Sequence, residues 1–168
     1  MKQSTSYTTI RIGTFLWCLF LFVPPLISSF ENMSNVISVR LYHFFSSICH
    51  QYDSRSLHLL GYKLAVCVRC LAIYLGFFVG TCFIQFRQKK YEASIALPLF
   101  IAVLPMLADV ILDLLNIHSS NTMTRLLTGA IFGVVAARVL VPIGIEGLNE
   151  LIADYHRLKG VNYESKTS

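Results

Sequence analysis

The chain has 168 residues, of which 55% are hydrophobic and 14% are charged, and its mean hydropathy is +0.61. This composition lies outside the range of soluble globular domains and predicts an integral membrane protein with one domain. The net charge of +5 does not indicate a nucleic-acid partner, because the basic residues flank apolar runs and suit lipid headgroups.

The first apolar run, residues 12–30, follows Lys2 and Arg11 and is just long enough to span a bilayer. Pro24 and Pro25 predict a kink or an early end of this helix. A secretory signal peptide is the alternative interpretation, because a basic start and a short apolar core are both present.

Residues 33–48 predict a short amphipathic helix at the membrane interface. Its apolar side chains recur at helical spacing: Ile37, Leu41, Phe44, Phe45 and Ile48. A simple loop helix packed on its neighbours is the alternative. A polar turn follows, and Gly61 predicts a bend.

Three further apolar runs predict three more spanning helices, at residues 64–86, 94–117 and 123–145. The fold class is therefore an all-α membrane protein with four transmembrane helices. Arg87, Lys89 and Lys90 favour a cytoplasmic position after the second span. Both termini, including a tail at residues 146–168, are then expected in the cytoplasm of a protein of the plasma membrane.

This topology gathers polar residues at the outer ends of the second, third and fourth spans. The second span begins with Cys67, Cys70 and Tyr74 on one face, with Arg69 on another. Other polar residues expected at that level are Arg55, Ser56, Asp109, Asp113, Asn121, Arg125 and Thr128. Charged groups in a span are expected to point inward and to pair, so Asp109 or Asp113 is predicted to pair with Arg125.

Cys49, His50, Cys67 and Cys70 are the candidate metal ligands, because Cys-x-x-Cys on one helical face presents two thiolates to one ion. Zinc is the metal that this set favours, and an open coordination position would permit metal-dependent enzyme chemistry. The candidate catalytic residues are Asp109 and Arg125, and no substrate is indicated.

Three other functions fit the same residues. The thiols could serve a membrane thiol–disulfide redox partner. A structural or assembly protein would instead carry a stapling disulfide between the outer segment and the second span. Cys49 or Cys67 could also act as a nucleophile with His50 as its base.

Two glycine pairs, Gly76/Gly80 and Gly129/Gly133, predict close helix contacts. They favour contact between the second and fourth spans. They could equally mediate a homodimer within the lipid bilayer.

The joint motif resembles a family of small prokaryotic predicted membrane proteins of unknown function. The first half carries Cys49-His50-Gln51, Arg55-Ser56, Gly61, Cys67-x-Arg69-Cys70 and Tyr74-x-Gly76. The second half carries Asp109 and Asn121-x-x-x-Arg125-x-x-Thr128-Gly129-x-x-x-Gly133.

The resemblance covers about residues 45–135 and implies that both halves contribute to one site. Where the family pattern has a glycine and a glutamine, this chain has Val110 and Asp113. That departure favours Asp109 over Asp113 as the functional carboxylate.

Overall fold

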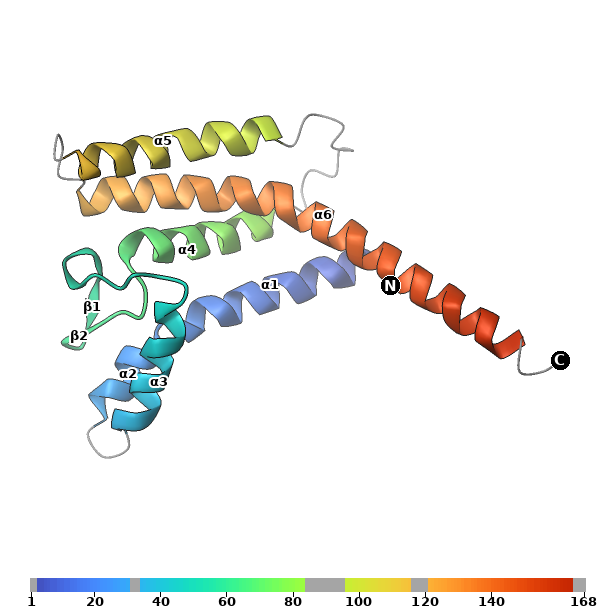
Figure 1. The fold of residues 1–168 in the computed structure, drawn as a ribbon, viewed down its shortest axis with the longest axis horizontal. Helices are drawn as coiled ribbons and strands as arrows, with labels where there is room; N and C mark the ends of the chain where they lie inside the picture. The colour runs from blue at the N-terminus through green and yellow to red at the C-terminus, as the bar shows by residue number, and fades with distance from the viewer. Residues whose placement is uncertain (1–2, 31–33, 84–95, 116–120, 165–168) are drawn as a thin grey trace.

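The computed structural model describes residues 3–30, 34–83, 96–115 and 121–164. Within these ranges the chain is mainly helical, with one small β-hairpin (Figure 1). The elements are α1 (Gln3–Phe20), α2 (Val23–Ser29), α3 (Ser34–Ser46), the 3-10 turn η1 (Asp53–Arg55), β1 (His58–Leu59), β2 (Tyr62–Lys63), α4 (Val68–Phe83), α5 (Ala96–Leu114) and α6 (Thr122–Glu164).

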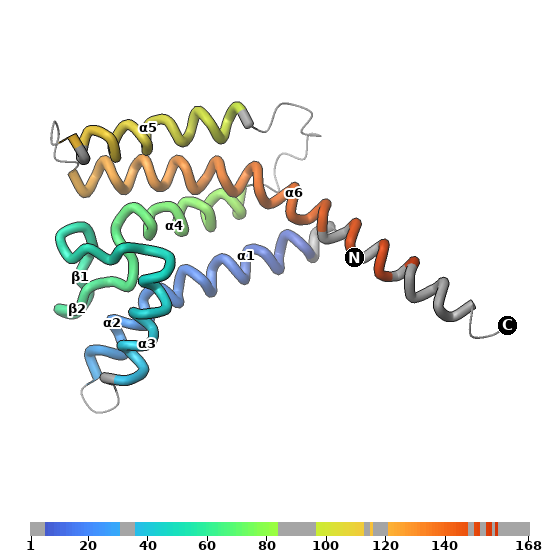
Figure 2. The backbone as a smooth tube through the Cα atoms, in the orientation of Figure 1, coloured from blue at the N-terminus to red at the C-terminus, as the bar shows by residue number. Residues whose placement is uncertain are grey.

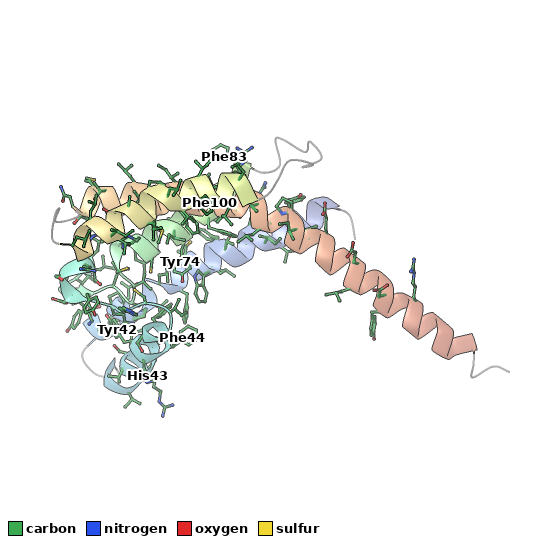
Figure 3. All side chains as sticks on the ribbon, turned by 45° about the horizontal axis from the view of Figure 1, so that its top comes forward. Tyr42, His43, Phe44, Tyr74, Phe83 and Phe100 are labelled. Carbon is green, nitrogen blue, oxygen red and sulfur yellow. The ribbon has the colours of Figure 1, made fainter. Side chains whose placement is uncertain are left out.

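Four helices lie side by side in the order α5, α6, α4, α1 (Figure 2). α5 ends and α6 begins at the end of the bundle where α4 begins, and α2, α3 and the hairpin lie at that same end (Figure 1). Large apolar side chains such as Phe83 and Phe100 (Figure 3) are exposed on the outside. An outer surface of this kind suits contact with lipid.

The glycines make the contact between α4 and α6 unusually close. A Cβ added to Gly76 or Gly133 would collide with backbone of the other helix, and one at Gly129 would lie 2.8 Å from the carbonyl oxygen of Arg69. Gly80 faces α6 in the same way. Small residues at this spacing therefore bring the two backbones together within one chain. A homodimer through the same glycines stays a prediction.

Two helical segments are long and apolar enough to cross a membrane, namely Ser6–Ser29 and Thr122–Gly147. The apolar helices Val68–Phe83 and Leu97–Leu112 are shorter. Four spanning helices are therefore not confirmed. The second predicted span began at residue 64, whereas α4 begins at Val68 because residues 64–67 are still part of the loop.

The first apolar run is a broken helix, as its prolines predicted. α1 ends at Phe20, and α2 begins at Val23 with Pro24 in its first turn, where a missing N–H group is tolerated. Arg11 does not precede the helix but lies within α1. Its guanidinium donates to the carbonyl oxygens of Thr81 at 3.1 Å and Cys82 at 3.4 Å, at the C-terminal end of α4.

The amphipathic segment forms α3, but its buried face differs from the predicted apolar stripe. Phe45 is fully buried, whereas Ile37 and Phe44 are about half exposed. Ser38 is buried instead, with its hydroxyl oxygen 2.5 Å from that of Ser28 on α2. The contact with α2 therefore determines which face of α3 is covered.

The predicted bend at Gly61 is the turn of a two-stranded antiparallel hairpin that the sequence did not predict. His58 pairs with Lys63, and Leu59 pairs with Tyr62. Leu60 and Gly61 both have positive φ angles, 54° and 84°. A two-residue hairpin turn of type I′ requires positive φ at both central residues, and Asn-Gly is a pair that such turns often contain.

The last helix continues far beyond the predicted fourth span. α6 has 43 residues, which corresponds to about 65 Å at 1.5 Å per residue. Its second half leaves the bundle and projects away from it (Figure 1). The residues expected to form a tail after residue 145 are therefore helical as far as Glu164.

Candidate functional site

Three cysteines from two loop junctions meet at one point. The Sγ atoms of Cys49, Cys67 and Cys70 all lie within 4.8 Å of one another. Cys49 is buried, and the other two are partly buried. All five cysteines of the chain are free thiols in this structure.

The end of α3 and the start of α4 position the three thiols. Cys49 follows the end of α3, and its amide N–H donates to the carbonyl oxygen of Phe45 at 2.9 Å. Cys67 directly precedes α4 and Cys70 lies in its first turn. The amide of Cys67 donates to the Sγ atom of Cys49 at 3.2 Å, which links the two segments.

A short hydrogen-bond network holds the Cys49 loop against the hairpin. The Gln51 side-chain amide donates to the carbonyl oxygen of Tyr42 (Figure 3) at 2.8 Å. The Tyr42 hydroxyl donates to the carbonyl oxygen of Lys63 at 2.5 Å, and the Lys63 ammonium donates to the carbonyl oxygen of Gln51 at 3.4 Å. Gln51 also has a positive φ of 48°, a rare conformation for a residue with a side chain. These bonds determine how the chain turns from Cys49 toward the hairpin.

The surroundings of Cys49 favour its thiolate. Hydrogen bonds from the thiols of Cys67 and Cys70 lower the pKa of Cys49, and the backbone N–H of Cys67 acts in the same direction. The N-terminus of α4 lies beside it and adds a positive partial charge. A thiolate is the form that binds metals and attacks disulfides.

The thiols line a cavity of about 280 Å³ together with polar and charged residues. The wall is formed by Ile48, Cys49, His50, Gln51, Tyr52, Arg55, Cys67, Arg69, Cys70, Met106 and Arg125. The wall thus combines the loop after α3, the start of α4, and α5 and α6. Several of these residues are exposed, so the cavity reaches the surface.

Arg69 and Asp109 form an ion pair beside the thiols. The Nη2 atom of Arg69 donates to Oδ2 of Asp109, and the two side chains are only 16% and 10% exposed. The sequence had placed Arg69 on a different face of its helix from the cysteines. Its side chain nevertheless lines the cavity. The predicted pairing of Asp109 with Arg125 stays a prediction.

Other predicted site residues have different surroundings. His50 is exposed and lies outside the three-cysteine group, although it lines the cavity and contacts the ring of Tyr52 edge-on at 6.0 Å. Tyr74 packs against Trp17 of α1 with ring centroids 5.9 Å apart (Figure 3). The Ser56 hydroxyl donates within its own turn, to the carbonyl oxygen of Tyr52 at 2.9 Å.

Two residues of the predicted polar cluster form hydrogen bonds with nearby backbone atoms in the first turns of α6. Asn121 is exposed, and its Oδ1 atom accepts a hydrogen bond from the amide of Thr122 at 2.8 Å. The Thr128 hydroxyl donates to the carbonyl oxygen of Thr124 at 2.8 Å. The side chain of Asp113 lies outside the described residues.

The sequence missed Met106 and Tyr52 as parts of the cavity wall. Met106 lies three residues before Asp109 on α5, and this spacing places both on one helical face. The ring of Tyr52 lies 5.6 Å from the guanidinium carbon of Arg55. Helical spacing was a usable signal for Met106, whereas nothing in the sequence distinguished Tyr52 from other loop residues.

The fold and site define an apolar helical protein with a cysteine cluster and buried charges at one end of its bundle. The chain belongs to a family described as predicted membrane proteins (DUF2085), whose match covers residues 49–139. The match begins at Cys49 and includes all three clustered cysteines, Asp109 and Arg125.

Two archaeal relatives are similar over much of their length. An uncharacterized protein of Methanocaldococcus jannaschii is 34% identical over 145 residues, which cover 83% of this chain and 93% of the relative. An uncharacterized protein of Methanothermobacter thermautotrophicus is 32% identical over 90 residues, covering 54% of this chain and 81% of the relative. No solved structure matches the chain.

Proposed function

We propose that this membrane protein binds a zinc-like metal ion through Cys49, Cys67 and Cys70. The observation that supports the proposal is the mutual approach of the three Sγ atoms within 4.8 Å. In a tetrahedral zinc site with Zn–S bonds of about 2.3 Å, sulfur atoms lie about 3.8 Å apart. Small side-chain rotations are therefore enough to convert the cluster into a metal site.

A fourth coordination position would face the cavity. Catalytic zinc sites commonly combine three protein ligands with a water, and the metal lowers the pKa of that water. His50 is the fourth predicted ligand, and in this proposal it is a residue of the cavity wall rather than a member of the cluster. Asp109 and Arg125 are the candidate catalytic side chains if the ion supports a metal-dependent reaction.

The location proposed for the site is the outer face of the plasma membrane, with four spanning helices and both termini in the cytoplasm. The arrangement of α4, α5 and α6 agrees with this topology, because consecutive helices alternate in direction (Figure 1). The basic cluster Arg87, Lys89 and Lys90 that orients the topology lies outside the described residues.

Metal content tests the proposal directly. The full-length protein, purified without chelator, is expected to contain about one zinc per chain and to show all five thiols after denaturation. Cys67→Ser should lose most of the metal, because two thiolates hold an ion poorly. Cys82→Ser is the matched control, since Cys82 lies at the other end of α4, and it should keep its metal.

A thiol–disulfide function is the second candidate, favoured by the same short distances between free thiols. It predicts protein without metal and with two of the three clustered thiols oxidised. Metal-free protein with two oxidised thiols would contradict the zinc proposal, whereas stoichiometric metal would support it. A disulfide that cannot be exchanged by added thiols would indicate a purely structural staple.

A further inference from the structure

A positive charge lies on the outer surface of α6, far from the cysteine site. Arg138 is exposed within the apolar segment Thr122–Gly147, and the nearby side chain of Leu140 is half exposed. At 1.5 Å per residue, Arg138 lies about 14 Å from the end of this segment, in the half remote from the cysteines. We propose that Arg138 and Arg11 bind the headgroup phosphate of an anionic lipid in the leaflet remote from the cysteine site. The inference goes beyond the metal proposal and does not depend on it.

The two arginines lie at the same level of the bundle. A Cβ added to Gly80 of α4 would lie 2.7 Å from the Cβ of Ala137, the residue before Arg138. Arg11 donates through Nε to the carbonyl oxygen of Thr81, the residue after Gly80. The same layer of α4 therefore contacts the α6 turn that carries Arg138 and the side chain of Arg11.

Both arginines also border the contact between α1 and α6. Tyr7 of α1 and Val141 of α6 are buried in one apolar cluster. Arg11 lies one turn after Tyr7, and Arg138 lies one turn before Val141, so each arginine is a neighbour of a contact residue on its own helix. Basic sites between spanning helices are where lipid headgroups bind specifically.

The described helices place no acidic side chain at this level. α1 and α4 contain no acidic residue, and the acidic residues of α5, Asp109 and Asp113, lie toward the cysteine end. On α6, Glu146 is about 12 Å further along the axis than Arg138. Within the described part of the chain, Arg138 has no hydrogen-bond or ion-pair partner. The partners of Arg11 are backbone carbonyl oxygens, which carry only partial charges.

The position and the residue type favour a lipid phosphate. A charge within a spanning segment is costly unless it is paired or extends to the headgroups, and a long arginine side chain near the end of a span does extend in this way. The guanidinium group matches phosphate oxygens in its geometry. A zwitterionic headgroup brings its own positive charge, so an anionic headgroup is the better partner for two arginines.

A carboxylate on a spanning helix of another chain is the competing partner for Arg138. A second copy of this chain does not supply one from its described helices, because they have no acidic residue at this level. The lipid is therefore the occupant that the observations favour.

Native mass spectrometry of the full-length protein in neutral detergent tests the inference, with phosphatidylglycerol as the anionic lipid and phosphatidylcholine as the zwitterionic comparison. The wild-type protein should bind phosphatidylglycerol about fivefold or more tightly than phosphatidylcholine. Arg138→Gln should weaken phosphatidylglycerol binding by about fivefold or more, because it removes charge-assisted hydrogen bonds to the phosphate. Since Arg138 is exposed, this substitution leaves no buried cavity.

Arg157→Gln is the matched control, because Arg157 is exposed on the projecting part of the same helix and the substitution removes the same charge. Its affinity for phosphatidylglycerol should stay within about twofold of the wild-type value. The comparison of the two lipids on the wild-type protein is informative whether or not a variant folds.

Equal affinity of the wild-type protein for the two lipids, or equal effects of Arg138→Gln and Arg157→Gln, would overturn the inference. A wild-type dimer that Arg138→Gln dissociates would also overturn it, and would identify a group of another chain as the partner. Metal content is expected to be the same in Arg138→Gln and in the wild-type protein, so absence of zinc would refute the metal proposal alone.

Discussion

At the scale of single residues, the contrast between two ion pairs shows what burial does to charge. Arg69 and Asp109 are largely buried, whereas the carboxylate of Asp53 lies 3.3 Å from His58 with 75% of its side chain exposed. Breaking a buried pair leaves an uncompensated charge, while water replaces the partner in an exposed pair. The two carboxylates therefore have very different expected effects on stability.

Asp109→Asn is expected to lower the free energy of unfolding by about 3–5 kcal/mol, because it leaves the Arg69 guanidinium buried beside a neutral amide. Asp53→Asn should change it by less than about 1 kcal/mol. Thermal unfolding of both variants in the same detergent, followed by circular dichroism, measures the difference. Equal stabilities would show that the Arg69–Asp109 pair is not buried as described.

At the scale of elements, the contact between α4 and α6 determines the shape of the site. Gly129 lies against the backbone of Arg69, and Arg125 is one turn earlier on α6. The glycines therefore set how closely Arg125 approaches the start of α4, where Cys67 and Cys70 lie. Packing of the helices and geometry of the cavity are linked through this contact.

Gly133→Ala should lower the stability of the bundle by about 3 kcal/mol, because the new Cβ would collide with the backbone of Ile73. Gly144→Ala, on the same helix, has no atom within 4 Å of the new Cβ. It should raise stability by up to about 1 kcal/mol through helix propensity. Unfolding midpoints of the two variants make the comparison, and a neutral Gly133→Ala would contradict the close contact.

At the scale of the whole molecule, the second half of α6 extends beyond the bundle (Figure 1). Leu151 and Tyr155 are mostly exposed in this part, whereas Ile145 is buried against Tyr7 of α1. The bundle therefore ends near residue 147, and the cysteine site lies at the opposite end of α6.

A chain that ends after Gly147 should keep the metal content of the full-length protein and unfold within a few degrees of it. The buried contact of Ile145 is retained in this truncation, so the loss of exposed helix should have little effect. Metal analysis and thermal unfolding of the two chains provide the measurement. Loss of the metal from the truncated chain would show that the projecting helix supports the site.

The membrane orientation has its own test. A reporter fused after Lys90 should indicate the cytoplasm, because the basic cluster at Arg87, Lys89 and Lys90 is expected to stay on that side. A fusion after Asn121 should indicate the outer side. A reversed pattern would place the cysteine site at the cytoplasmic face.

By itself, the sequence determined the class of protein and the candidate residues. Apolar composition and helical spacing predict helices, and the small-residue spacing predicted the contact of α4 with α6. Prolines predicted the break between α1 and α2. These signals are local, so they can be read within a few turns of one segment.

Only the tertiary structure decided which side chains meet. Cys49 reaches the cysteines of α4 through the loop network around Gln51, and Arg69 bonds to Asp109 across forty residues of sequence. The buried face of α3, the hairpin and the length of α6 also differed from local expectation. In each case the reason is physical: burial, ion pairing and turn conformation depend on partners that are distant in the chain, and helical spacing carries no information about them.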